Sequence, residues 1–264
     1  MKESEFTSWL DYQKFEHHVK EERRYVHDIE AQRLLRTVLM TSESRKTKLP
    51  KERYLWRAQL GNSWRPIYQS DCESPNEEEI HVTDISCALP SERMKPCMGS
   101  ASEGRANPKG IPCLYLSKDK ETAMSEVRPW IGSLISVGQF RTIRDLELVN
   151  CTLHHKGFIF HFSEPGPLER EQAVWSDIGR AFSRPVNPSD TVADYVPTQI
   201  IAELFKSNGI DGIVYSSSLG KNLNVVLFDL DSAELMSCSL FGVKTVSFTF
   251  DEADETYYVG KRKA

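Results

Sequence analysis

The sequence lacks the long apolar runs that would place it in a membrane. Its longest apolar stretches, such as residues 224–228, have the length of a strand, whereas a membrane-spanning helix needs roughly 18 apolar residues. The N-terminus begins M-K-E-S-E and has neither the apolar core nor the small-residue cleavage site of a secretory signal. We therefore expect a cytoplasmic protein with no membrane partner.

Metal and disulfide signatures are also missing. None of the six cysteines forms a C-x-x-C pair, and the four between positions 72 and 113 are irregularly spaced, with only His81 among them. Structural zinc sites need Cys and His ligands at short, regular spacings, and a chain of 264 residues does not need disulfides for stability. We predict reduced, mostly structural thiols and no metal site.

Motifs of several enzyme classes are absent as well. The chain has no G-x-G-x-x-G after a strand, no G-x-x-x-x-G-K-[ST], no H-E-x-x-H and no G-x-S-x-G. Common nucleotide hydrolases, zinc proteases and esterases are thereby excluded. The 33 basic and 38 acidic residues give a net charge of -5, so direct binding to nucleic acid through bulk electrostatics is not expected.

The first fifty residues differ from the rest of the chain. They contain no Gly, and no Pro before Pro50, and apolar residues recur mostly three to five positions apart. This spacing favours two amphipathic helices or one long bent helix. We predict a helical extension over residues 1–50, which either caps the main domain or offers a surface for a partner or a second copy. Residues 42–52 are polar and lysine-rich and predict a linker.

The remaining residues, 51–264, predict one catalytic domain of mixed structure. Residues 61–110 are rich in Ser, Pro, Asn and Gly and predict a long irregular connection. Strand patterns occur at residues 54–60, 111–116, 134–140, 146–149, 158–162, 211–215, 224–230 and, as looser alternation, 234–259. Helix patterns occur at 119–127, 168–182 and 198–207. Because strands and helices do not alternate regularly, an α+β fold is expected.

Isolated polar residues stand beside the apolar positions of these elements. Arg57 interrupts the first strand, Tyr115 lies in the second, and Glu126 lies on the helix that follows. Their ordinary explanations are a structural ion pair for Arg57, a core position for Tyr115 and a solvated helix face for Glu126. The full set of candidate site residues is Arg57, Arg105, Tyr115, Glu126, Ser217 and Asn224.

The order of these residues resembles the RES domain family. After the arginine strand come G-R-x-N-x-x-G-x-P-x-L-Y-L-S at 104–117, a glutamate eleven residues beyond that tyrosine, D-G-I-x-Y-x-S, and N-x-V-L-F. Each fragment alone is weak, but the ordered set between residues 54 and 228 is specific. The resemblance implies an ADP-ribosyltransferase-like split β-sheet core with flanking helices, preceded here by the helical segment.

The resemblance also implies a function. RES-family proteins are known as toxins of bacterial toxin–antitoxin pairs that degrade NAD+ or transfer its ADP-ribose. By position, Glu126, Arg57 and Tyr115 would be catalytic, and Arg57, Arg105, Tyr115, Ser217 and Asn224 would bind NAD+. No cofactor is implied beyond NAD+ as substrate. The implied partner is a small protein antitoxin with a helix-turn-helix.

The chemistry of NAD+ cleavage suits these residue types. Nicotinamide leaves the cation as a neutral base, so no general acid is needed and one carboxylate can suffice where most O-glycosidases need two. A carboxylate stabilises the oxocarbenium-like transition state, arginines bind pyrophosphate bidentately, and an aromatic ring offers a stacking face. The acceptor remains open between water and phosphate. The alternatives are a mono-ADP-ribosyltransferase that modifies a protein and a non-catalytic NAD-binding or interaction module.

Overall fold

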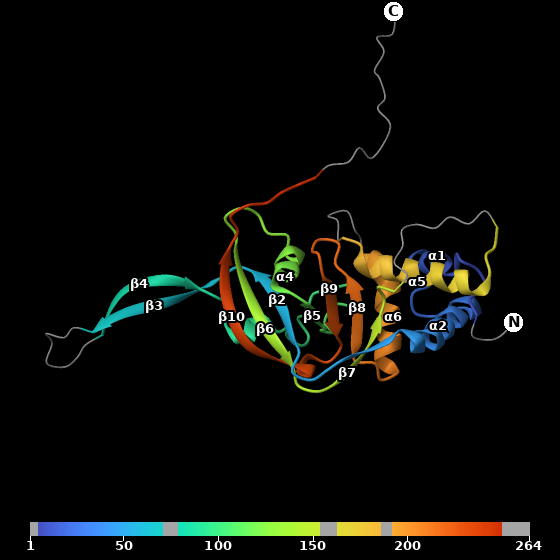
Figure 1. The fold of residues 1–264 in the computed structure, drawn as a ribbon, viewed down its shortest axis with the longest axis horizontal. Helices are drawn as coiled ribbons and strands as arrows, with labels where there is room; N and C mark the ends of the chain where they lie inside the picture. The colour runs from blue at the N-terminus through green and yellow to red at the C-terminus, as the bar shows by residue number, and fades with distance from the viewer. Residues whose placement is uncertain (1–4, 71–78, 154–162, 186–191, 250–264) are drawn as a thin grey trace, which may run out of the picture.

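A mixed β-sheet forms the centre of the molecule (Figure 1). The computed structural model describes residues 5–70, 79–153, 163–185 and 192–249. The eight strands of the sheet run in the order β1-β7-β8-β9-β5-β2-β6-β10, and only the β7–β8 pair is parallel. Their bounds are β1 (Lys46–Leu49), β2 (Tyr54–Leu60), β5 (Leu114–Ser117), β6 (Leu134–Thr142), β7 (Leu146–Asn150), β8 (Gly212–Ser216), β9 (Leu223–Leu227) and β10 (Ala233–Gly242).

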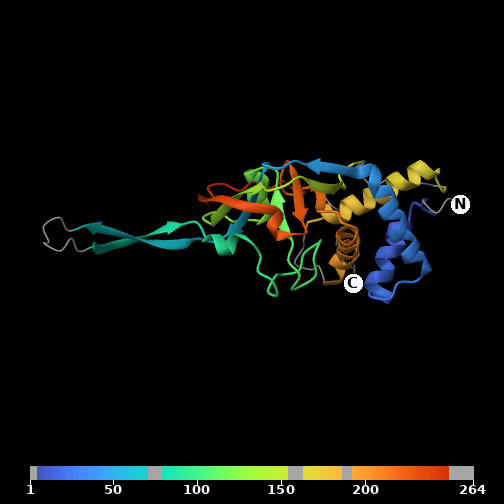
Figure 2. The same cartoon turned by 90° about the horizontal axis from the view of Figure 1, so that it is seen from below.

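The helices gather mainly at one end of this sheet. Figures 1 and 2 show the N-terminal helices together with α5 and α6 beside the β7–β8 end, whereas α4 lies against β2 and β5. The helices are α1 (Asp11–His17), α2 (Ile29–Ser42), α3 (Ser91–Met94), α4 (Lys120–Glu126), α5 (Pro167–Ser183) and α6 (Val196–Ser207). A π-helical turn at His18–Glu22 extends α1, and 3-10 turns occur at Glu43–Arg45, Val192–Tyr195 and Leu230–Ser232. This arrangement confirms the predicted α+β class and the N-terminal helical segment.

The N-terminal helices share a hydrophobic core with the rest of the chain. Phe15 of α1 and Leu34 of α2 belong to the same buried cluster as Trp175 of α5 and Phe205 of α6. The Trp175 ring stacks on Phe205 with centroids 6.5 Å apart, and its Nε1 donates to Thr41 Oγ1 at 3.0 Å. The helices therefore cap the main fold, the first of the two arrangements considered for them.

The predicted linker over residues 42–52 is wrong in its centre. Residues 46–49 form β1, which pairs antiparallel with β7 from Lys46↔Val149 to Leu49↔Leu146. The lysines that suggested a solvated linker lie on an edge strand, and the Lys46 ammonium is 2.9 Å from the Glu147 carboxylate of β7. Charged side chains are well tolerated at a sheet edge, so polarity alone did not distinguish a linker from this strand.

The predicted irregular connection over residues 61–110 is wrong in its first half. β3 (Ser63–Ser70) and β4 (Glu79–Cys87) form an antiparallel hairpin that projects away from the sheet (Figures 1 and 2). Trp64, Ile67 and Tyr68 give β3 the aromatic and β-branched residues that favour strands. The irregular part begins after β4 and includes residues 95–113, which approach the site described below.

Most other predicted elements are confirmed to within a few residues. The exceptions are the strand expected at 111–116, which begins only at Leu114, and the alternation at 234–259, which is a strand only to Gly242. The strand expected at 158–162 and the stretch 250–259 lie outside the described residues. In the described ranges, no helix is long and apolar enough to span a membrane.

The buried cysteines provide a test of the core. Burial raises the pKa of the Cys113 thiol to about 11 and that of Cys151 to about 12, whereas Cys97 is exposed. Because the thiolate is the reactive form, only about one Cys113 thiol in a thousand is ionised near pH 8. We expect iodoacetamide to label Cys97 and spare Cys113 and Cys151 in the folded protein, as measured by peptide mass spectrometry. Equal labelling of all three would contradict the packing described here.

Candidate functional site

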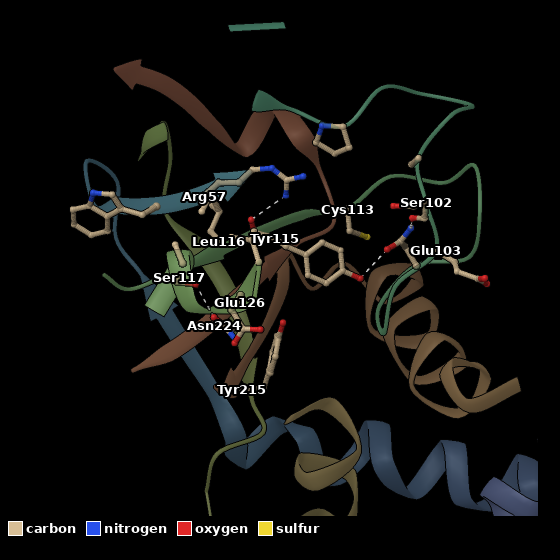
Figure 3. A pocket seen from close by; sticks show the side chains of 17 residues that line it. Arg57, Ser102, Glu103, Cys113, Tyr115, Leu116, Ser117, Glu126, Tyr215 and Asn224 are labelled. Carbon is tan, nitrogen blue, oxygen red and sulfur yellow. Dashed lines mark hydrogen bonds between the residues drawn. The ribbon is translucent and has the colours of Figure 1, made fainter. Parts of the chain in front are cut away.

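Two adjoining cavities lie where β2, β5 and β9 meet α4, and Figure 3 shows the first of them. The first cavity has a volume of about 310 Å³ and the charged lining residues Arg57, Glu103 and Glu126. The second cavity has a volume of about 400 Å³ and adds Arg105, Arg128 and Arg184. The residues that line both cavities are Glu103, Tyr115, Glu126, Tyr215 and Asn224. The two cavities therefore form one cleft.

Glu126 is positioned by the end of a short helix. The carboxylate of Asp119 caps the first turn of α4 by accepting from the Thr122 N–H at 2.6 Å. The helix ends at Glu126, three residues before Pro129. Its side chain is exposed and borders both cavities, although Ala123 of the same helix is buried. Glu126 therefore reaches the cleft from its rim.

Two predicted residues hold the Glu126 carboxylate. Its Oε1 accepts a hydrogen bond from Ser217 Oγ at 2.5 Å and another from Asn224 Nδ2 at 2.6 Å. Among the described residues, no hydrogen bond is made to its Oε2. One carboxylate oxygen is therefore anchored, and the other is free to interact with a ligand.

The loop after β8 orients the Ser217 hydroxyl. Ser217 Oγ accepts from the Leu219 N–H at 3.1 Å and the Gly220 N–H at 2.7 Å, which leaves its single proton for Glu126. A Cβ on Gly220 would lie 2.7 Å from the Thr122 side chain, so the loop can approach α4 only because this residue is glycine. Of the three consecutive serines, Ser217 is thus the one that contacts the glutamate.

Sequence reasoning missed the residue that orients Asn224. Ser117 of β5 lies opposite Asn224 of β9 in the strand register, and its Oγ donates to Asn224 Oδ1 at 2.7 Å. Both side chains are buried. Because Oδ1 is occupied, the amide nitrogen of Asn224 faces Glu126. Ser117 closes the L-Y-L-S motif, but only the strand pairing reveals its partner.

The Tyr115 hydroxyl has a structural role in addition to the stacking face that is expected of the ring. Its hydroxyl donates to Asn107 Oδ1 at 2.7 Å and accepts from the Ala106 N–H at 3.0 Å. Burial holds its pKa well above the usual value, so the hydroxyl stays protonated. A Cβ on Gly104 would lie 2.5 Å from this oxygen. The hydroxyl fixes the loop at 104–107, while the ring borders both cavities.

Asn107 does more than shape a turn. Besides accepting from Tyr115, this buried side chain donates through Nδ2 to the backbone oxygens of Ser102, Pro108 and Ile111. Gln199 of α6 donates to the Asn107 carbonyl at 3.0 Å and to the Gly104 carbonyl at 2.9 Å. The loop that carries Glu103 and Arg105 is thereby fastened to the fold at several points.

The two predicted arginines enter different parts of the cleft. Arg57 of β2 points into the first cavity, where its Nη1 donates to the Tyr115 carbonyl at 3.2 Å (Figure 3). Its Nε has no hydrogen-bond partner in the described part of the chain, and burial lowers the guanidinium pKa. Arg105 lines the second cavity, donates to the Ala181 carbonyl at 2.9 Å and lies over the Tyr195 ring. Both arginines are half-buried.

Tyr215 and Glu103 border both cavities but were not predicted as site residues. Burial, together with the negative charge of Glu126, raises the pKa of Tyr215 well above its usual value. Tyr215 belongs to the D-G-I-x-Y-x-S motif, so its signal was present in the sequence. Glu103 precedes the G-R-x-N motif, and only the course of the loop brings it to the cleft.

Comparison with known proteins places the chain in a family. The family model of the RES domain matches residues 85–251, well over half of the chain. Among curated proteins, none matches the sequence. A chain of the crystal structure of the M. tuberculosis MbcT–MbcA toxin–antitoxin complex is similar at a TM-score of 0.40 and 11% sequence identity, covering 78% of this chain and 92% of that chain. Arg57 precedes the matched range, whereas the other predicted site residues lie within it. The chain belongs to the RES domain family.

Proposed function

We propose that this protein degrades NAD+ by cleaving the nicotinamide–ribose bond. The observation that carries the proposal is the Glu126 carboxylate, whose Oε1 is anchored by Ser217 and Asn224 while Oε2 has no hydrogen bond among the described residues. A carboxylate held in this way presents negative charge to the cleft without needing to reorganise. Such preorganised charge is suited to a reaction in which positive charge develops beside it.

The bond that breaks joins C1′ of the ribose to the ring nitrogen of nicotinamide. The electron pair of that bond leaves with nicotinamide, which becomes neutral, and the ribose acquires oxocarbenium character. The free oxygen of Glu126 stabilises this charge and accepts a hydrogen bond from a ribose hydroxyl. The acceptor oxygen then bonds to C1′ and, when the acceptor is water, loses its proton to solvent. No second catalytic carboxylate is required.

The remaining site residues bind and orient the substrate. Arg105 lies with Arg128 and Arg184 in the lining of the second cavity, and planar guanidinium groups suit a dianionic pyrophosphate. The Tyr115 ring offers a face for nicotinamide. Arg57 lines the first cavity but not the second, where the other arginines lie, so we assign its contribution to the nicotinamide end rather than to the pyrophosphate.

Transfer of ADP-ribose to a protein is the alternative activity. In a transferase, loops beside the cleft would contact the acceptor protein, and the segment 61–103 is the first candidate for such contacts. Its hairpin projects away from the cleft, and among its described residues only Pro96, Ala101, Ser102 and Glu103 line the first cavity. This placement favours a small acceptor, water or phosphate, over a docked protein.

Labelled NAD+ distinguishes the acceptors. We expect incubation with NAD+ labelled in its adenosine part to release nicotinamide together with free ADP-ribose, or with ADP-ribose 1″-phosphate when phosphate is present. A cell lysate in which label moves onto proteins would instead support transfer. If purified protein leaves NAD+ intact, the enzymatic proposal fails and the non-catalytic binding module replaces it.

The biological role follows from the family. Toxins of toxin–antitoxin pairs are known in the RES family, and loss of cytoplasmic NAD+ would stop growth. We extend this role to the present chain and expect a protein antitoxin with a helix-turn-helix that covers the cleft. Induced expression should arrest growth as cellular NAD+ falls, and co-expression of the product of a neighbouring small gene should restore both.

Ser217 offers a test of how Glu126 is held. Ser217→Ala removes one of the two donors to Oε1, and a hydrogen bond to a charged group contributes about 1.5–3 kcal/mol. We expect kcat/KM for NAD+ to fall by about tenfold or more, as measured by nicotinamide release. Ser216→Ala is the matched control, because Ser216 makes no hydrogen bond to the glutamate in the described structure. Equal activity of the two variants would show that Ser217 does not contribute to catalysis.

A further inference from the structure

A third cavity adjoins the cleft and is built partly by the N-terminal helix. Its volume is about 690 Å³, and it lies between α1, which contributes Tyr12, Gln13 and Glu16, and the C-terminal end of α5. The third cavity shares Ser183, Arg184, Pro185 and Ser218 with the second cavity. The three cavities therefore lie in a row that leads from β2 to α1.

The charged residues along this row change in a way that matches the parts of a dinucleotide. Among the described residues that line the first cavity, carboxylates outnumber arginines, because Glu103 and Glu126 accompany Arg57. Among those of the second cavity, arginines outnumber carboxylates, because Arg105, Arg128 and Arg184 are added. Among those of the third cavity, Arg180 and Arg184 are balanced by Glu16 and Asp177. Cationic nicotinamide, anionic pyrophosphate and neutral adenosine fit these cavities in that order.

We propose that the third cavity binds the adenosine end of NAD+ and that α1 is therefore part of the substrate site. This inference rests on the proposed function. It goes beyond the family, because α1 precedes residues 85–251, over which the RES domain matches. Helix α1, which caps the core together with α2, would then also extend the cleft that the domain alone provides.

The walls of the third cavity carry groups suited to an adenosine. Tyr12 is only 3% exposed, and its hydroxyl has no hydrogen-bond partner among the described residues. The Ser183 Oγ atom is also buried and also has no hydrogen-bond partner among those residues. Gln13 Nε2 donates to Asp177 Oδ2 at 3.2 Å, while its amide oxygen makes no hydrogen bond in the described part of the chain. Ribose hydroxyls and adenine nitrogens bind to hydroxyl, amide and carboxylate groups of this kind.

The test compares a whole substrate with half of it. Nicotinamide mononucleotide contains the scissile bond but lacks the adenosine end. Gln13→Trp places a large side chain in the third cavity. We expect the ratio of kcat/KM for NAD+ to kcat/KM for nicotinamide mononucleotide to fall about tenfold, which is equivalent to ~1.4 kcal/mol. Gln32→Trp is the matched control, because Gln32 is an exposed residue of α2 that lines none of the three cavities.

The outcomes separate this inference from the proposed function. Thermal unfolding of both variants first shows whether the fold is retained, and Gln13→Ala replaces Gln13→Trp if it is not. If the wild type cleaves NAD+ but the substrate ratio is the same in the Gln13 and Gln32 variants, the adenosine site is wrong and the proposed function stands. If the wild type cleaves neither substrate, both fail.

Discussion

Glu126→Gln is expected to reduce NAD+ cleavage by about 100- to 1000-fold, the range seen when a preorganised electrostatic group is removed from an active site. Glutamine keeps the size of the side chain, and its amide oxygen can still accept from Ser217 and Asn224. The amide nitrogen then takes the place of Oε2. The cleft would present the positive end of an N–H group where the oxocarbenium charge develops, and the transition state would be destabilised. Substrate binding is retained, because the side chain keeps its size and its hydrogen bonds.

Nicotinamide release at saturating NAD+ measures this effect. The expected loss is in kcat, with KM changed little, because the ground-state contacts of the substrate remain. Glu121→Gln is the matched control on the same helix, since Glu121 is exposed and lines none of the three cavities. In cells, Glu126→Gln should relieve growth arrest and Glu121→Gln should not. If Glu126→Gln cleaved NAD+ as fast as the wild type, the Glu126 carboxylate would not be required for the reaction.

The cluster around Glu126 shows what a sequence can predict about a site. Glu126, Ser217 and Asn224 were predicted from the order of three short motifs, and the structure brings them together through two hydrogen bonds. Each motif specifies its own local structure: Glu126 lies on a capped helix, Ser217 in a turn after a strand, and Asn224 near the start of a strand. Motif order therefore carries three-dimensional information, provided that the sheet pairs the strands as it does here.

The parts that were missed depend on pairing between distant residues. Ser117 acquires its role only because β5 and β9 place it opposite Asn224. The Lys46–Leu49 strand is an edge strand whose partner, β7, lies about a hundred residues later in the sequence. The third cavity depends on how α1 packs against α5, which no local pattern specifies. Local composition predicts elements, but which elements touch is determined by the whole core.

The packing of the N-terminal helices leads to the largest expected change in stability. Trp175 is fully buried, and it joins the two parts of the chain through its stack on Phe205, its hydrogen bond to Thr41 and the Arg45 guanidinium 4.4 Å from its ring centroid. Truncating a buried tryptophan costs about 3–5 kcal/mol, because apolar contacts are lost and a cavity remains. Trp175→Ala also leaves the buried Arg45 side chain without its aromatic neighbour.

We therefore expect Trp175→Ala to lower the free energy of unfolding by about 3–5 kcal/mol in urea titrations, and to loosen α1 and α2 together with α5. Trp64→Ala is the matched control, because Trp64 is 65% exposed on the projecting hairpin, and surface substitutions change stability by about 0.5 kcal/mol or less. If α1 and α2 were an independent appendage, they would unfold in a separate transition, and Trp175→Ala would shift only the transition of the remaining core. A single transition that shifts as a whole means that α1 unfolds together with that core, so that the contacts proposed for α1 are as well ordered as those on the sheet.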